Sequence, residues 1–151
     1  MSPFNYCPLV WMFCSKKAFK LLNKTHHKAL NARFGNYQTS LEDLLDFSES
    51  INIHTQHLRA LALEIYKTVN RLNPEIMWDA FKVKAPNKYE LRRGSTLNVP
   101  KARTTRAINS FDFRAAMAWN QLPLSLKLAK DESEFKTLLK SEKVYCKCVN
   151  C

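Results

Sequence analysis

The sequence predicts one small, mainly α-helical domain with a basic segment, irregular or folded as a short β-hairpin, near residues 82–108. Three observations support this fold class. The chain has 151 residues, which is enough for one hydrophobic core. It has only two glycines, which disfavours tight turns and glycine-rich phosphate loops. Apolar residues recur every three or four positions along most of the chain. We expect a helical region over residues 1–145 and a separate cysteine cluster over 146–151.

The first long helix is expected from Lys16 to Phe34, with Gly35 placed to end it. Lysines recur every four residues along one side, and His27 falls on that side, where we expect it in solvent. His26 lies in the apolar stripe and is interpreted as a buried histidine with hydrogen-bond partners rather than a ligand. The apolar stripe consists of Phe19, Leu22, His26, Ala29 and Leu30.

Five further helices are indicated by capping residues and periodicity. Ser40 precedes a short helix, with Asp43 at its third position, and a longer helix is expected over residues 53–72. Asn73-Pro74-Glu75 opens a brief helix, another covers residues 110–122, and a last one starts at Asp131 or Ser133. The predicted inward residues are Leu58, Leu61, Ala62, Ile65, Val69, Phe113, Met117, Trp119, Phe135, Leu138 and Leu139.

The net charge of +11 is concentrated in two segments. Residues 16–33 hold six lysines and arginines and no acid, and residues 82–106 hold eight against Glu90 alone. Segregated basic surface of this kind attracts polyanions, although a solvated face is the alternative. No sequence-reading signature accompanies it, so we expect contacts to phosphates rather than to bases. The candidate contacts are Lys16, Lys20, Lys24, Lys28, Arg92, Arg93, Arg103 and Arg106.

No pattern in the chain indicates catalysis. Its paired acids stand at helix starts, where capping explains them, and no nucleophile-elbow or zinc-protease motif occurs. Cys7 and Cys14 flank an apolar run that we expect to be buried and inert. That run, residues 8–14, is too short to span a bilayer and lacks the features of a signal peptide. We therefore expect an intracellular protein, cytoplasmic or nuclear, with reduced cysteines.

The chain closes on VYCKCVNC, which places Cys146, Cys148 and Cys151 within six residues. Thiolates at this spacing can share a zinc ion, but a structural zinc site needs four ligands. The fourth would have to be His26, His54 or His57, far away in sequence. A metal site and a disulfide both remain open from the residues alone.

The motifs FNYCPLVWMFCS, LNKTHHKALNARF, LEDLL and LNPEIMWDAF follow one another in an order that resembles a known family. That family is the non-LTR, jockey-like retrotransposon reverse transcriptases, in the segment after the polymerase palm. The basic stretch, the Trp119-x-x-Leu122-Pro123 motif, the Phe135-Lys136 helix and the terminal cysteine cluster continue the similarity. It covers the chain from Phe4 to Cys151. Arg114-Ala115-Ala116 departs from the Gly-Pro of the family.

This resemblance implies a thumb-like, mostly helical region that holds nucleic acid beside a palm domain. The sequence has no adjacent pair of aspartates to bind the catalytic metals, so we expect no polymerase activity from this chain alone. The expected role is non-specific binding of an RNA or DNA backbone, with a palm domain as a candidate partner and no membrane. The resemblance favours zinc at the cysteine cluster. The alternatives are a retroelement relic without function, in which residues 8–14 lack a packing partner, and a small zinc-stabilised interaction module.

Overall fold

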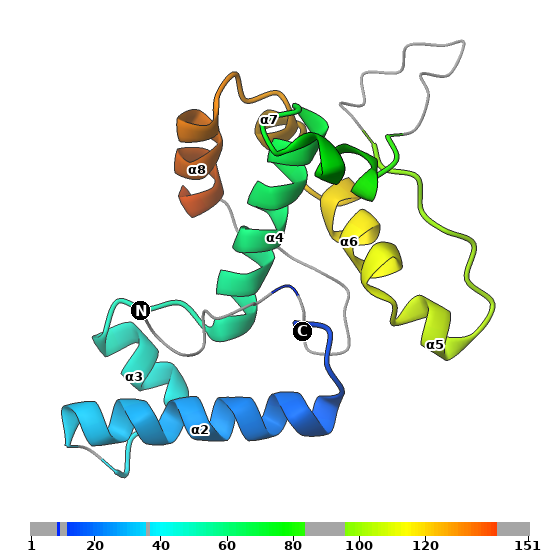
Figure 1. The fold of residues 1–151 in the computed structure, drawn as a ribbon. Coiled ribbons are helices and arrows are strands. Elements are labelled where there is room, and N and C mark those ends of the chain that lie inside the picture. Colours follow the sequence, from blue (N-terminus) through cyan, green and yellow to red (C-terminus); the bar gives the residue numbers. More distant parts are fainter. Residues whose placement is uncertain (1–8, 10–11, 36, 84–95, 142–151) are drawn as a thin grey trace.

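The computed structural model describes residues 9, 12–35, 37–83 and 96–141, and these form a mainly α-helical domain, as the sequence predicts (Figure 1). Its elements in chain order are α2 (Lys16–Phe34), α3 (Leu41–Phe47), α4 (Ile53–Val69), the 3-10 helix η2 (Glu75–Ala80), α5 (Thr105–Ile108), α6 (Phe111–Asn120), α7 (Leu124–Lys127) and α8 (Glu132–Ser141).

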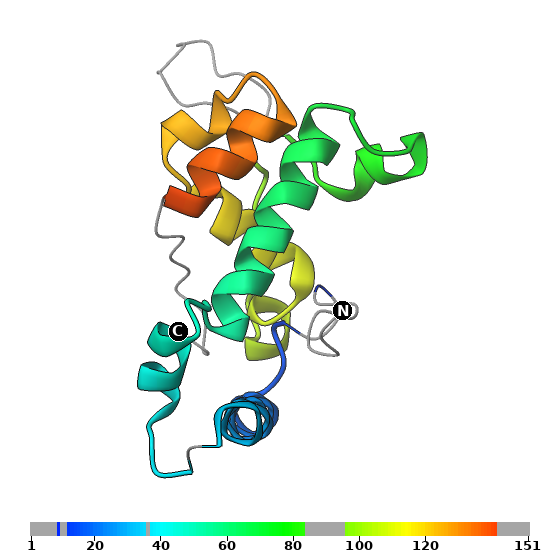
Figure 2. The same ribbon diagram turned by 90° about the vertical axis from the view of Figure 1, so that its left-hand side faces the viewer.

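The main core is built around α4, which packs against α6 on one side and α8 on the other (Figures 1 and 2). Its centre is a row of three aromatic rings, one from each helix. Phe135 stacks on Tyr66 with ring centroids 4.3 Å apart, and the Trp119 ring centroid lies 6.3 Å from that of Phe135. All three side chains are almost completely buried. The Tyr66 hydroxyl donates a hydrogen bond to the Ala129 carbonyl at 3.0 Å. These contacts fix the three helices to one another.

A second, much smaller core joins α2 to α3. It consists of Leu30 from α2 and Leu44 and Leu45 from α3, with Phe34 and Leu41 at its edge. Figure 1 shows α2 crossing the base of the molecule beneath α3 and the start of α4. Leu30 and Asn31 are the only residues of α2 that are buried. The first helix is therefore a peripheral element with most of its surface in solvent.

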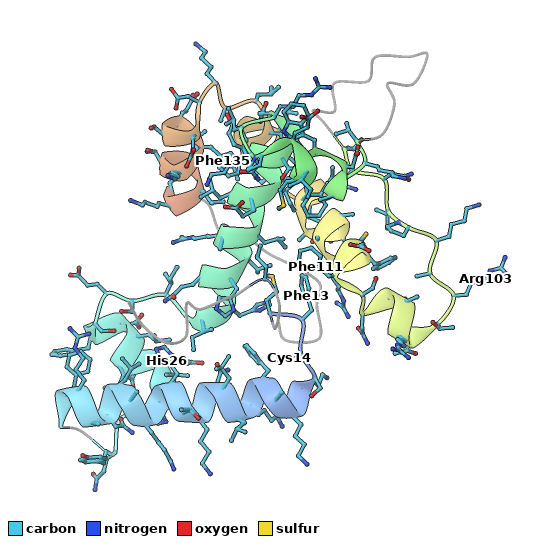
Figure 3. All side chains as sticks on the ribbon, in the orientation of Figure 1. Phe13, Cys14, His26, Arg103, Phe111 and Phe135 are labelled. Atoms are coloured by element: carbon cyan, nitrogen blue, oxygen red, sulfur yellow. The ribbon has the colours of Figure 1, made fainter. Side chains whose placement is uncertain are left out.

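The residues before α2 belong to the main core. Met12 is 1% exposed, and Leu9 and Phe13 are half-buried against the same cluster. The rings of Phe13 and Phe111 lie 6.1 Å apart (Figure 3). The relic alternative, in which this apolar run lacks a packing partner, is thus wrong on this point for the described residues, because they pack in the main core and Phe13 contacts Phe111 of α6.

Side-chain caps determine where the helices begin. Ser15, Ser40, Asn52 and Ser110 each accept a hydrogen bond from the backbone N–H three residues later, which satisfies an otherwise unpaired donor. Gly35 ends α2 in the left-handed conformation, with φ of 66°. The predicted bounds of α2 and the predicted start of α3 are confirmed.

The structure corrects three details of the helix predictions. Helix α4 ends at Val69 rather than at residue 72, because Arg71 takes φ of 56° and reverses the chain. The brief helix after it is a 3-10 helix with Pro74 at its cap position, and Asn73 instead donates from its amide to Glu64 and Thr68. In α6, Phe113 and Met117 are only half-buried.

The buried face of α6 consists of Ala115, Ala116, Ala118 and Trp119. Small residues allow α6 to approach α4 closely, which brings the Trp119 ring to the aromatic row. On the first helix, Ala29 is exposed rather than inward, and on α4 and α8 Val69 and Leu138 are half-buried. The other predicted inward residues of α4 and α8 are buried.

The start of the predicted basic segment, residues 82–108, pairs with residues 97 and 98 in its middle. Val83 and Leu97 form an antiparallel bridge, and the Asn98 N–H donates to the Lys82 carbonyl at 2.8 Å. This pairing fits the base of a hairpin, while residues 84–95 lie outside the described part. The C-terminal end of the segment is not irregular, because Thr104 caps the four-residue helix α5. Among the described residues, no helix is both long and apolar enough to cross a membrane.

Replacing Phe135 by alanine should lower the free energy of unfolding by about 3–5 kcal/mol, because it removes the middle ring of the buried row. Phe47→Ala is the matched control, since its ring is 74% exposed and its loss should cost about 1 kcal/mol or less. Urea unfolding followed by circular dichroism measures both. Equal losses for the two variants would show that the row does not hold the fold together.

Candidate nucleic-acid interface

The lysines of α2 form a continuous exposed surface. Lys16, Lys20, Lys24 and Lys28 are all exposed, as is Lys17. Residues four apart on a helix are separated by about 6 Å along its axis and rotated by about 40°. The four lysines therefore wind gradually around about a third of the helix. In Figure 3, nitrogen-tipped side chains project from the lower edge of α2, away from α3 and α4.

The charges of α2 oppose the stability of the helix that carries them. A helix N-terminus bears partial positive charge, and lysines there are unfavourable. Lys16, Lys17 and Lys20 occupy the first turns of α2, where no acid offsets them. Lysines four residues apart also repel one another. By contrast, α3, α6 and α8 carry acids in their first turns. Helix α4 has no acid there either, but its first turn carries no lysine. α2 is thus electrostatically unfavourable in isolation.

Salt bridges between described residues lie elsewhere in the molecule. Lys67 on α4 contacts Glu64 at 3.3 Å and Glu132 at 3.7 Å, and Lys136 contacts Glu132 at 2.6 Å. The hydrogen bond from Lys136 is the main cause that lowers the pKa of the Glu132 carboxyl. Within the described part of the chain, none of these ion pairs includes a lysine of α2.

The body of α2 is held by a few contacts on its inner side. The Phe19 ring lies edge-on to the buried His54 ring of α4, with centroids 5.6 Å apart. A ring nitrogen of His27 lies 2.9 Å from the Thr39 carbonyl oxygen, in the loop before α3. His27 is therefore half-buried and ties α2 to that loop, which corrects its expected place in solvent.

His26 is half-buried and points upward from α2 toward the body of the molecule (Figure 3). Burial lowers the pKa of its imidazole below 6.5, and the neighbouring His27 lowers it further. The neutral form of the ring is favoured in the folded chain. The predicted buried position of His26 is thus only partly met, because the side chain is half-buried.

A second exposed basic region lies beyond the N-terminal end of α2, on and before α5 (Figure 1). Arg103 points outward beside α6, and Arg106 is exposed on α5 (Figure 3). Two anchors fix the chain that leads to them. Leu97 is buried in the main core, and the Asn120 side chain binds its backbone twice. Asn120 Oδ1 accepts from the Leu97 N–H at 2.8 Å, and Asn120 Nδ2 donates to the Leu97 carbonyl at 3.0 Å.

The structure does not bring the predicted contact residues onto one face. The α2 lysines follow the base of the molecule, whereas Arg103 and Arg106 lie beyond the end of α2 beside α6 (Figures 1 and 3). Arg92 and Arg93 lie outside the described residues. The two exposed regions would contact a long polyanion at separate points.

The predicted metal ligands Cys146, Cys148 and Cys151 also lie outside the described residues. Of the histidines considered as a fourth ligand, His54 and His57 are buried in α4 and His26 is half-buried on α2. In the described part of the chain, no group of three or more His, Cys, Asp or Glu side chains is placed to hold a metal ion. Burial raises the pKa of the half-buried Cys14 thiol, which disfavours the nucleophilic thiolate.

The main core contains a cavity of about 10 Å³, lined by apolar side chains of α4 and α6 and by Leu122, two residues after α6 ends. This volume is about that of one water molecule, so the cavity has no room for a cofactor or an organic substrate. Its lining residues are Leu58, Leu61, Ala62, Ile65, Ala118, Trp119 and Leu122.

Comparisons with known proteins identify no relative: no family model, no curated protein and no solved structure matches the chain.

Sequence reasoning missed Asn120 and Lys127. The Lys127 ammonium donates to the Asn120 carbonyl at 3.0 Å, and burial lowers the pKa of Lys127. Asn120 thus links α6, α7 and the start of the second basic region. No local pattern marks such a residue, because its partner Leu97 is 23 positions away.

Asn120→Asp should destabilise the fold by about 1–3 kcal/mol, because a carboxylate keeps the acceptor but cannot donate to the Leu97 carbonyl. Asn98→Asp, at an exposed position, is the control. Chemical denaturation measures both changes. A value for Asn120→Asp no larger than that of the control would contradict the role given to this side chain.

The lowered pKa of His26 predicts a pH dependence with a defined sign. Neutral His26 contributes to the free energy of unfolding at pH values above its ordinary pKa of 6.5. This contribution is lost as the pH falls toward and through the lower pKa that His26 has in the folded chain. Because the ring is half-exposed, the change should be below about 1 kcal/mol. His26→Gln should flatten the pH profile of the unfolding free energy between about pH 5 and 7. Superimposable profiles for the two proteins would refute the assignment.

Proposed function

We propose that this chain binds the sugar–phosphate backbone of RNA or DNA without sequence preference. The lysines of α2 make the main contact, and Arg103 and Arg106 make a second one. In this proposal the chain is the post-palm, thumb-like part of a retrotransposon reverse transcriptase, acting in the cytoplasm or nucleus with a palm domain as partner. The order of sequence motifs supports the family, and the surface of α2 supports the binding.

One observation carries the binding proposal: α2 places lysines at its positive end and along its length without any acid in its first turn. Packing does not require these side chains, since all four lysines are exposed. A polyanion along α2 would relieve both the repulsion between the lysines and their conflict with the helix dipole. Residues that oppose local stability without serving the core are expected at functional surfaces.

The proposed mechanism is counterion release. Each lysine that neutralises a phosphate displaces a condensed cation from the nucleic acid, so affinity falls as salt rises. Lysine suits this role because its ammonium is a compact charge on a flexible stem that does not demand one fixed geometry. Contacts of this kind position a strand but do not read its bases. Polymerisation itself would require the carboxylates of a separate palm domain.

Binding to a DNA duplex should weaken steeply between about 50 and 200 mM salt. The triple variant Lys20→Gln, Lys24→Gln, Lys28→Gln should lower the slope of log K against log salt by about 2–3, because each lost phosphate contact removes about 0.9. Fluorescence anisotropy with labelled duplexes of two unrelated sequences measures the slope.

The matched control is Lys130→Gln, Lys136→Gln, Lys140→Gln, which removes the same charge from exposed residues in and beside α8. It should leave the slope within about 1 of the wild-type value. Equal losses in both triple variants would mean that net charge, rather than the α2 surface, drives binding. Affinity that does not change with salt would rule out the proposed function.

A further inference from the structure

The second basic region contains an exposed threonine flanked by basic residues. The sequence there runs Lys101-Ala102-Arg103-Thr104-Thr105-Arg106, and its three basic side chains and both threonines are exposed. Basic residues at fixed offsets from a hydroxyl are the charge pattern by which many protein kinases choose their substrates. The proposed nucleic-acid contacts give Thr104 itself no role.

The backbone presents Thr104 differently from Thr105. Thr104 has φ of −114° and ψ of 151°, an extended conformation, whereas Thr105 is the first residue of α5. Residues 98–103, which precede Thr104, have no regular secondary structure. An enzyme cleft that binds a substrate in extended form can accept Thr104 and the residues before it without unfolding a helix. Thr105 would require α5 to open.

We propose that Thr104 is a phosphate acceptor for a basic-directed serine/threonine kinase, and that its phosphorylation weakens polyanion binding at this region. The Thr104 Oγ1 attacks the γ-phosphorus of Mg-ATP, and the bond from that phosphorus to the β–γ bridging oxygen breaks. ADP leaves, and the hydroxyl proton passes to a carboxylate of the kinase. The second half of this proposal rests on the proposed function, and the first half does not.

The local charges explain the expected effect. A phosphothreonine carries a charge of about −1.5 to −2, which offsets about half to two thirds of the combined charge of Lys101, Arg103 and Arg106. The phosphate would also be tolerated by the fold. Thr104 Oγ1 already accepts from the Ala107 N–H at 3.2 Å, and negative charge at a helix start is favourable. The modification would therefore change the surface without disrupting α5.

The acceptor site is tested by incubating the full chain with the catalytic subunit of a basic-directed kinase and Mg-ATP, followed by peptide mapping with mass spectrometry. Phosphate is expected on Thr104. Mapping is the readout because Ser95 follows Arg92-Arg93-Gly94 in the sequence and can also react. Thr104→Ala should remove the phosphate from this peptide, whereas Thr105→Ala and Thr104→Ser should retain it.

Arg103→Gln should slow phosphorylation of Thr104 by about tenfold, the factor that corresponds to about 1.4 kcal/mol of lost recognition. Circular dichroism spectra of the variants check that each remains folded. An unmodified peptide 98–109 after prolonged reaction of the wild-type chain, or phosphate on this peptide in Thr104→Ala, overturns the assignment of Thr104.

The regulatory half is tested by comparing duplex binding of the two forms in a Ser95→Ala background. The phosphorylated form should bind about tenfold more weakly at low salt, with a salt slope smaller by about 1–2. Equal binding of both forms overturns the regulatory half. If neither form binds nucleic acid, the proposed function and this half both fall, whereas the acceptor site is decided by the mapping alone.

Discussion

The fold depends on the aromatic row in which Phe135 lies between Tyr66 and Trp119. This contact joins residues of three helices that lie up to 69 positions apart in the sequence, from Tyr66 to Phe135. Two further features secure it: the Tyr66 hydroxyl reaches the Ala129 carbonyl, and the alanines of α6 permit a close approach to α4. Burial, and then the neighbouring carboxylates Asp131, Glu134 and Glu132, raise the pKa of Tyr66, so the hydroxyl remains a donor.

Because the main core is complete without α2, the first helix is free to carry charges that a core helix could not. Its own packing partner is α3, through the small cluster of Leu30, Leu44 and Leu45, and Phe19 connects it to α4 at His54. A helix with few buried residues and repelling lysines gains little stability from its own sequence. The same arrangement leaves its charged side accessible along its whole length. The low stability of α2 and the accessibility of its lysines to a polyanion thus have the same cause, which is that few residues of α2 are buried.

The sequence predicted the helices well where local chemistry determines them. Serine caps and Gly35 set helix ends within a few residues, and the 3–4 spacing of Leu58, Leu61 and Ile65 identified the buried side of α4. It predicted less well which side chains are buried and which partners they bind where contacts between distant residues determine this. Alanine rather than Phe113 faces α4, His27 finds a carbonyl in the next loop, and Asn120 binds Leu97 across 23 residues. Exposure of the α2 lysines followed from spacing, but their separation from Arg103 is a property of the tertiary fold.

We propose that α2 is destabilised by its own charge and that a bound polyanion relieves the repulsion between its lysines. The most direct measurement is amide hydrogen exchange of the full chain with and without a DNA duplex, at low and at high salt. The duplex should slow exchange in α2 more than in α4 at low salt, and high salt should abolish the difference. Unchanged exchange in α2 under conditions where the duplex is bound, or protection confined to α4 and α8, would contradict it.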